Sequence, residues 1–222
     1  MPGTLFIVGT PIGNLEDITQ RAVRILSTVD AIACEDTRVS GKLFSHLGIR
    51  KTLVPLHEHS GVGAMDRVIE RLRKGESVAY VSDAGTPGVN DPGGKLVAAC
   101  IEHKIRIEPI PGVSALTAAI SVCGFPMDEF VYAGFMPHKK GKETMMKEMA
   151  ARAAPTVFLE STHRIEKTLT ALASHMPERQ VFIGRELTKM HETLYRGTVD
   201  EVLKQLQATS TKGEFVVIIG PA

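Results

Sequence analysis

Short apolar runs alternate with segments of helical periodicity through the first half of the chain. Continuous apolar runs are typical of buried strands and predict them at residues 5–8, 31–34, 52–56, 77–82 and 106–110. Between the first two runs, the apolar spacing predicts a helix that carries Ile18, Ala22, Ile25, Leu26 and Val29 on one face. Asp17 is placed to cap this helix. The order βαβαβαβαβ predicts an α/β fold with a mostly parallel five-stranded sheet covered by helices on both faces.

The second half has a different rhythm. Its apolar runs predict strands at residues 130–135, 156–161, 180–187, 193–197 and 214–220. No helical segment separates 180–187 from 193–197, which indicates a hairpin and therefore a mixed sheet. The segment GFPMDEF (124–130) combines glycine, proline and two acids, so we place the junction there. The predicted domains are an N-terminal α/β domain over 1–123 and a C-terminal α/β domain over 124–222.

Composition narrows the classes of function. The 222 residues carry a formal net charge of +1, so a polyanion has to be held by local patches rather than by a protein-wide field. Three scattered cysteines, Cys34, Cys100 and Cys123, argue against a disulfide framework or a structural zinc site and suit small buried core positions. A strand-like run begins after four residues, and no stretch has the ~20 apolar residues of a membrane helix. We expect a cytoplasmic protein with no membrane partner.

Glycine-rich segments follow three of the predicted strands. They are GTPIGN (9–14), SDAGTPGVNDPGG (82–94) and PGVSA (111–115). Glycine and proline fix sharp turns and let the backbone approach a ligand closely. In an open parallel sheet, ligands bind at the carboxyl ends of the strands. The sequence therefore predicts a ligand cleft at this edge.

The residues of these segments restrict the ligand. Neither GxGxxG nor GxxxxGK[ST] is present. Residues 82–94 contain Asp83 and Asp91 and no basic side chain before Lys95, whereas a phosphate site favours positive charge. A neutral or cationic ligand is favoured, such as S-adenosylmethionine with its sulfonium, ammonium and ribose diol. The alternative is that Asp83 and Asp91 only cap turns.

Three other segments carry candidate chemistry. After the second strand, Glu35 and Asp36 precede Arg38, either as an ion pair facing the substrate or as a purely structural pair. The segment HEH (57–59) lacks a third ligand of matching spacing, so we expect no metal and favour contact with a base. The cluster HKKGK (138–142) is either a solvated loop or a phosphate contact.

Taken in order, several sequence motifs of the chain resemble those of the tetrapyrrole methylase superfamily and, within it, of the ribosomal RNA small subunit methyltransferase I family. The matching segments are TPIGNLEDIT (10–19), EDTR (35–38), HEH (57–59), VSDAGTPGVNDPG (81–93), PGVSA (111–115), GFMP (134–137), ESTHR (160–164), RELTKMHE (185–192) and GEFVVII (213–219). They span residues 10 to 219, so the resemblance covers essentially the whole chain.

The resemblance implies two α/β domains with S-adenosylmethionine in the cleft between them, and a homodimer. It also implies 2′-O-methylation of a cytidine in 16S ribosomal RNA, with that RNA or the small ribosomal subunit as partner and no role for DNA. The cofactor contacts that it implies are Pro11, Asp83, Ala84, Gly85, Val89, Ser114, Ala115, Leu159, Arg185 and Gly220.

The expected chemistry is an in-line displacement, in which positioning supplies most of the acceleration. A ribose hydroxyl is a poor nucleophile, so a base would help by about 10²–10⁴-fold. The candidate bases are Glu35, Asp36 and Glu186, and the residues that would orient the phosphate or the hydroxyl are Arg38, Arg185 and Lys189. Two alternatives stay open: carbon methylation of a tetrapyrrole, disfavoured by EDTR, ESTHR and RELTK, and a nucleotide-binding module without catalysis.

Overall fold

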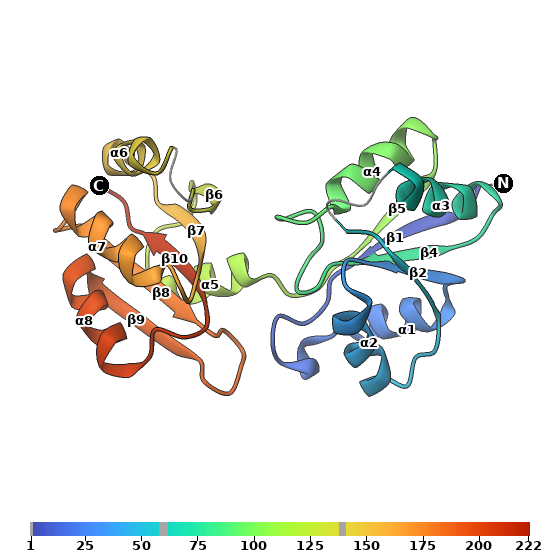
Figure 1. Ribbon diagram of the computed structural model, residues 1–222, viewed down its shortest axis with the longest axis horizontal. Coiled ribbons are helices and arrows are strands. Elements are labelled where there is room, and N and C mark those ends of the chain that lie inside the picture. Colours follow the sequence, from blue (N-terminus) through green and yellow to red (C-terminus); the bar gives the residue numbers. More distant parts are fainter. Residues whose placement is uncertain (1, 58–61, 138–140) are drawn as a thin grey trace. The chain divides into compact units, whose positions relative to one another are not determined.

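The computed structural model describes residues 2–57, 62–137 and 141–222. Its contacts divide the chain into two compact units, Met1–Ser114 and Ala115–Ala222. Each unit is a five-stranded sheet packed against helices (Figure 1). The described residues contain no helix long and apolar enough to cross a membrane.

The first unit is a parallel sheet with strand order β3-β2-β4-β1-β5. Its elements are β1 (Thr4–Val8), the short 3₁₀ helix η1 (Leu15–Asp17), α1 (Gln20–Thr28), β2 (Ala31–Cys34), α2 (Thr37–His46), β3 (Thr52–Pro55), α3 (Val62–Arg73), β4 (Val78–Val81), α4 (Gly93–Glu102) and β5 (Arg106–Ile110). Every strand that the apolar runs predict in this half is present, with bounds that differ by two residues at most. Parallel pairing follows because a helix separates each strand from the next.

Both faces of this sheet are buried, as the continuous apolar strands predict. Ala31 and Ala33 of β2 point into a core shared with α3 and α4. Ile32 and Cys34 point the opposite way, into a core shared with α1 and α2. Figure 1 shows the two helix layers on opposite sides of the sheet.

The start of α1 differs from the sequence prediction. Thr19, not Asp17, is the N-cap, because its hydroxyl accepts a hydrogen bond from the Ala22 amide at 3.1 Å. Asp17 ends η1, whose own cap is Asn14. The apolar spacing locates the helix correctly, but several polar residues precede it, and only the backbone path decides which one reaches its amides.

The second unit is a mixed sheet of order β6-β7-β10-β8-β9. Its elements are α5 (Ala115–Cys123), β6 (Val131–Phe135), α6 (Lys142–Ala151), β7 (Thr156–Ser161), α7 (Ile165–His175), β8 (Gln180–Arg185), β9 (Thr193–Thr198), α8 (Val199–Thr209) and β10 (Glu214–Ile219). The predicted hairpin is confirmed, since β8 and β9 pair antiparallel with Gly184 opposite Leu194. Only β6 and β7 are parallel, which makes the sheet mixed as expected.

The division between the units falls after Ser114, earlier than the predicted junction at residues 124–130. The helix α5 accounts for the difference, because it packs against β10 and β8 of the second sheet (Figure 1). Its small apolar residues gave no sign of which sheet would cover them. The glycine- and proline-containing segment lies between α5 and β6, inside the second unit.

Candidate functional site

The three glycine-rich segments lie together at the carboxyl edge of the first sheet. β1 lies between β4 and β5, so the loops that follow these three strands are neighbours. The Thr10 amide donates to the Gly85 carbonyl at 2.9 Å, and the Gly85 amide donates back to the Thr10 carbonyl at 3.1 Å. The Thr86 hydroxyl donates to the Val113 carbonyl at 3.0 Å. The loops after β1, β4 and β5 therefore form one connected structure, as the sequence predicts.

Two glycines let these loops approach one another. A Cβ atom on Gly9 would lie 2.7 Å from the Gly112 Cα, and a Cβ atom on Gly112 would lie 2.9 Å from the Gly9 Cα. Both obstacles are backbone, which cannot move aside as a flexible side chain does. Gly85 requires glycine for a different reason, because its φ of +78° is one that other residues rarely adopt. These positions explain why the sequence places glycine in each loop.

The residues proposed as cofactor contacts on these loops differ in exposure. Pro11 and Gly85 are buried and form the floor of the loop structure. Ala84 and Val89 are exposed, Val89 by 42%. Ser114 is half-buried and ends the first unit. As contacts of a cofactor, all five stay predictions.

The two aspartates of the loop after β4 have different roles. Asp91 accepts hydrogen bonds from the amides of Gly88 at 2.8 Å, Val89 at 3.1 Å and Gly93 at 2.7 Å. Its carboxylate holds the turn in place and leads the chain into α4. Asp83 is exposed and accepts the Asp36 amide at 3.0 Å, which joins this loop to the end of β2. The turn-capping alternative therefore applies to Asp91, and Asp83 faces the solvent edge of the site.

The two acidic residues that follow β2 also differ in their surroundings. Asp36 is the N-cap of α2, accepting the Arg38 amide at 2.8 Å, and its carboxylate binds the Arg38 guanidinium at 2.6 Å. Hydrogen bonds from the Arg38 side chain and amide lower the pKa of Asp36 far below its ordinary range. Glu35 precedes it and is half-buried at the carboxyl end of β2. Sequence spacing could not tell these roles apart.

In the second unit, the segment RELTKMHE forms the β8–β9 turn. Lys189 lies 3.0 Å from Glu186 and 2.7 Å from Glu214, forming a three-residue ionic network. Burial alone would raise the pKa of Glu186, but the Glu214 amide and the Lys189 ammonium together hold it below its ordinary value. Burial would lower the pKa of Lys189, and the two carboxylates raise it instead. Both candidate catalytic residues of this turn are therefore charged and paired.

The Arg185 side chain forms hydrogen bonds that hold the same turn. It is 9% exposed and donates to the carbonyls of Lys212 at 2.6 Å and His191 at 3.0 Å. Glu186 and Thr188 have positive φ values of 51° and 66°, a conformation that costs energy in residues other than glycine. The guanidinium ties His191, near the end of this turn, to Lys212 in the connection that precedes β10. That structural task is the one that the geometry assigns to Arg185.

The other two residues proposed from this unit lie on its central strands. Leu159 is a half-buried residue of β7, paired with Val216 of β10. Gly220 is buried just after β10, and a Cβ atom there would lie 3.1 Å from both the Gln180 carbonyl and the Phe125 ring. Ala115, proposed from PGVSA, begins α5. Like the other proposed cofactor contacts, these three stay predictions of the family resemblance.

One polar cluster escaped the sequence analysis, although most of its residues belong to ESTHR. Glu160 is fully buried on β7 and pairs with Arg164 at 3.2 Å. It also accepts the Thr168 hydroxyl at 2.8 Å and the Ser161 amide at 2.9 Å. Arg164 in turn donates to the carbonyls of Met136 and Pro137. The i,i+4 spacing of Glu160 and Arg164 was the available signal, and the cluster joins the start of α7 to the end of β6.

Two candidate segments lie partly outside the described residues. His57 is exposed, and Glu58 and His59 fall in the gap at 58–61. His138, Lys139 and Lys140 fall in the second gap, whereas Lys142 is half-buried and donates to Thr168 at 3.4 Å. Among the described residues, no group of three potential metal-binding side chains lies together.

Comparison with known proteins places this geometry in a family. Residues 4–203 match the family model for Tetrapyrrole (Corrin/Porphyrin) Methylases. Proteins named Ribosomal RNA small subunit methyltransferase I are 46% identical in Mesorhizobium japonicum and 44% identical in Escherichia coli O157:H7, covering 98% of this chain and 75% and 77% of theirs. The Thermotoga maritima protein of the same name is 40% identical and is covered over 98% of its length.

Solved structures agree on the fold. A diphthine synthase superposes with a TM-score of 0.78 at 16% identity, covering 99% of this chain and 90% of its own. A uroporphyrin-III-C-methyltransferase from Thermus thermophilus has a TM-score of 0.68 at 21% identity, covering 98% and 94%. The chain belongs to the tetrapyrrole methylase family and, within it, to the ribosomal RNA small subunit methyltransferase I group.

Proposed function

We propose that this protein is an S-adenosylmethionine-dependent methyltransferase that modifies the ribose 2′-hydroxyl of a cytidine in 16S ribosomal RNA during rRNA processing. The observation that carries the proposal is the near-full-length identity of 40–46% to proteins named for methylating small-subunit ribosomal RNA. The likeness to the uroporphyrin methyltransferase, at 21% identity, supports a shared fold and gives no support to a tetrapyrrole substrate.

The strand-end loops suit S-adenosylmethionine. When bound, the cofactor supplies a methyl group activated by a sulfonium. Its two cationic groups favour oxygen acceptors, and the loop at 82–94 has no basic side chain and presents the exposed Asp83 carboxylate. The tight contact of Gly9 with Gly112 fixes the backbone that would line the ligand. A site with this charge would bind a triphosphate poorly.

Among the three candidate bases, we favour Glu35. Hydrogen bonds from Arg38 lower the pKa of Asp36, and, against the effect of burial, the Glu214 amide and Lys189 lower that of Glu186. A carboxylate whose pKa is depressed by such partners accepts a proton weakly. Glu35 lies at the carboxyl end of β2, beside the loop structure that Asp83 joins. Its role would be to accept the proton of the ribose hydroxyl.

The proposal is tested by mapping 2′-O-methylation in small-subunit RNA from cells with and without the protein, and by methyl transfer from labelled cofactor to purified small subunits. Loss of one modified cytidine in the deletion strain is the expected result. Unchanged methylation at every position, together with transfer to uroporphyrinogen, would overturn the proposed substrate. For the base, Glu35→Gln should lower the methyl-transfer rate by about 10²-fold or more, while cofactor affinity in calorimetry stays unchanged.

The same proposal includes a homodimer, as the family resemblance implies, and a location in the cytoplasm, where ribosomal subunits are assembled. Light scattering after size-exclusion chromatography tests the dimer, because it separates a mass of 24.0 kDa from twice that value. A monomer at micromolar concentration would remove the dimer from the proposal and leave the reaction unaffected.

A further inference from the structure

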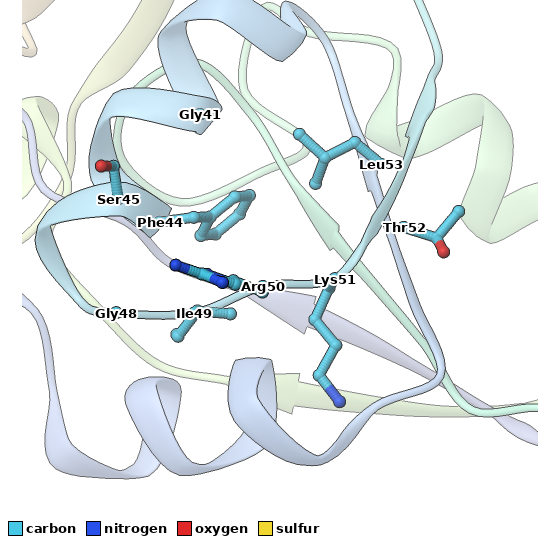
Figure 2. A pocket seen from close by; sticks show the side chains of 9 residues that line it. All are labelled: Gly41, Phe44, Ser45, Gly48, Ile49, Arg50, Lys51, Thr52 and Leu53. Carbon is cyan, nitrogen blue, oxygen red and sulfur yellow. The ribbon is translucent and has the colours of Figure 1, made fainter.

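A pocket of about 700 Å³ opens on the first unit beside the edge strand β3 (Figure 2). It is lined by the second half of α2, the connection to β3 and the start of that strand, namely by Gly41, Phe44, Ser45, Gly48, Ile49, Arg50, Lys51, Thr52 and Leu53. α2 starts just after the carboxyl end of β2 and runs back, so the connection reaches β3 at the amino edge of the sheet. The pocket is therefore separate from the glycine-rich loops, which occupy the carboxyl edge.

The charge of the pocket is positive. Arg50 and Lys51 are adjacent in its lining, and no acidic residue lines it. Within the described part of the chain, Arg50 has no hydrogen-bond or ion-pair partner. The hydroxyl and the amide of Ser77 donate to the Asp30 carboxylate, each at 2.7 Å, and lower its pKa. The charge of Lys51 lowers the pKa of Asp30 further. Arg50 is thus available to an external anion, whereas Asp30 partly offsets the charge of Lys51.

A structural explanation for Arg50 would be that it satisfies the carbonyl groups at the end of α2. Backbone amides already do so. Leu47 donates to the Leu43 carbonyl at 3.0 Å, Gly48 donates to the Ser45 carbonyl at 3.3 Å, and Ile49 donates to the Phe44 carbonyl at 2.9 Å. This is the Schellman arrangement that ends a helix with glycine in a left-handed conformation, here at a φ of +67°. Arg50 is not needed for capping.

The remaining walls are apolar or small. Phe44 and Ile49 form a wall that is almost fully buried, with 4% and 8% exposure, and Leu53 is half-buried. Cβ atoms built on Gly41 or Gly48 meet nothing within 4 Å, so these glycines leave open space. Figure 2 shows Arg50 extending on the same side as Phe44, whereas Lys51 and Thr52 point in other directions. The pocket therefore presents one cation, Arg50, beside open space and above a largely buried apolar base.

We propose that this pocket binds one phosphate-bearing nucleotide of a single-stranded RNA segment, at a distance along the RNA from the nucleotide that is methylated. This inference rests on the proposed function, which supplies the RNA. Arg50 would hold a phosphate in the planar geometry that guanidinium favours, and Lys51, which points in another direction, would add only longer-range attraction. The ribose and base would occupy the open space that Gly41 and Gly48 leave. The volume suits a ligand of nucleotide size.

The first test measures binding of a fluorescein-labelled twelve-residue oligocytidylate to the full chain by fluorescence anisotropy. Arg50→Ala/Lys51→Ala should raise Kd roughly 10-fold at 0.15 M salt and reduce the salt slope by about 0.7, because one lost phosphate contact on a single strand contributes about 0.7 to that slope. The matched control is Arg73→Ala/Lys74→Ala, which removes the same pair of exposed residue types outside the pocket. The control should change Kd less than 2-fold.

A second variant tests the pocket without changing charge. Gly41→Leu places a side chain in the open space of the pocket and replaces a helical glycine, so it should fold at least as stably as the parent while weakening oligonucleotide binding 5-fold or more. Binding within 2-fold of the parent for both Gly41→Leu and Arg50→Ala/Lys51→Ala would overturn the inference. So would equally tight binding of free cytidine monophosphate, which would make a free nucleotide the ligand.

The outcomes also separate this inference from the proposed function. Methyl transfer to small subunits with an unchanged KM in Arg50→Ala/Lys51→Ala would contradict the RNA pocket and leave the methyltransferase standing. Oligonucleotide binding that depends on Arg50 and Gly41, in a protein that transfers no methyl group to small subunits, would support the pocket and contradict the reaction.

Discussion

The buried Glu160 carboxylate predicts a large and localised loss of stability on substitution. The side chain is completely shielded from solvent, and three groups converge on it: the Arg164 guanidinium, the Thr168 hydroxyl and the Ser161 amide. Thr168 is itself fully buried. Replacing Glu160 by Ala removes the counter-charge of Arg164, whose side chain is only 19% exposed, and leaves the Thr168 hydroxyl without this acceptor.

The magnitude follows from two independent estimates. Removing one partner of a buried ion pair costs about 3–5 kcal/mol. Counting instead the two hydrogen bonds that the carboxylate accepts from Thr168 and Ser161, each worth about 1.5 kcal/mol at the lower end of the range for charged groups, gives about 3 kcal/mol before the ion pair is included. Glu160→Gln keeps the volume and one acceptor oxygen, so it should cost about half as much. The destabilisation should be confined to the second unit, since all the partners lie in it.

Hydrogen exchange followed by mass spectrometry suits this prediction, because it reports each unit separately where a single unfolding curve would not. Peptides of β7 and α7 should lose protection in Glu160→Ala, and peptides of the first sheet should be unchanged. The control is Glu166→Gln on the neighbouring helix α7, an exposed residue whose change should stay within about 0.5 kcal/mol. A Glu160→Ala protein within 1 kcal/mol of the parent would refute the reasoning, since the carboxylate would then contribute no more than a surface pair.

Three further predictions follow from other parts of the chain. Gly41→Ala should raise the free energy of unfolding by about 0.5–1 kcal/mol in urea titrations, because it adds a Cβ to a helix where no atom lies within 4 Å; a loss of stability would contradict the open space there. Gly9→Ala should cost about 1–3 kcal/mol and weaken S-adenosylmethionine binding in calorimetry, whereas Gly94→Ala, with open space, should leave binding intact. A backbone carbonyl of α7 and the Glu143 carboxylate raise the pKa of His175, so its contribution to stability is complete below the ordinary pKa of about 6.5 and disappears as pH rises through the raised value. His175→Gln should therefore lose more stability at pH 5.5 than at pH 8.5, and an equal loss at both would count against the charged pair.

Much of the site could be anticipated because glycine placement is a local signal. Gly85 needs a positive φ, and Gly9 and Gly112 need the absence of a side chain, so each of these requirements can be read from the glycine in its own segment. The roles of the acidic residues could not be read from their own segments in this way. Asp91 and Asp83 belong to the same loop, yet one accepts three backbone amides and the other accepts the amide of Asp36 from a different strand end. That difference depends on contacts between loops distant in sequence.

The sequence by itself determined the two α/β halves, the strands, the β8–β9 hairpin and the edge at which the glycine-rich loops meet, because hydrophobic periodicity and backbone requirements act over a few neighbouring residues. Tertiary structure decided the rest. It assigned α5 to the second sheet, gave Arg185 the task of bracing the β8–β9 turn, and opened a basic pocket beside β3. Each of these depends on which surfaces the folded chain brings together, and segments far apart in sequence carry no local record of that choice.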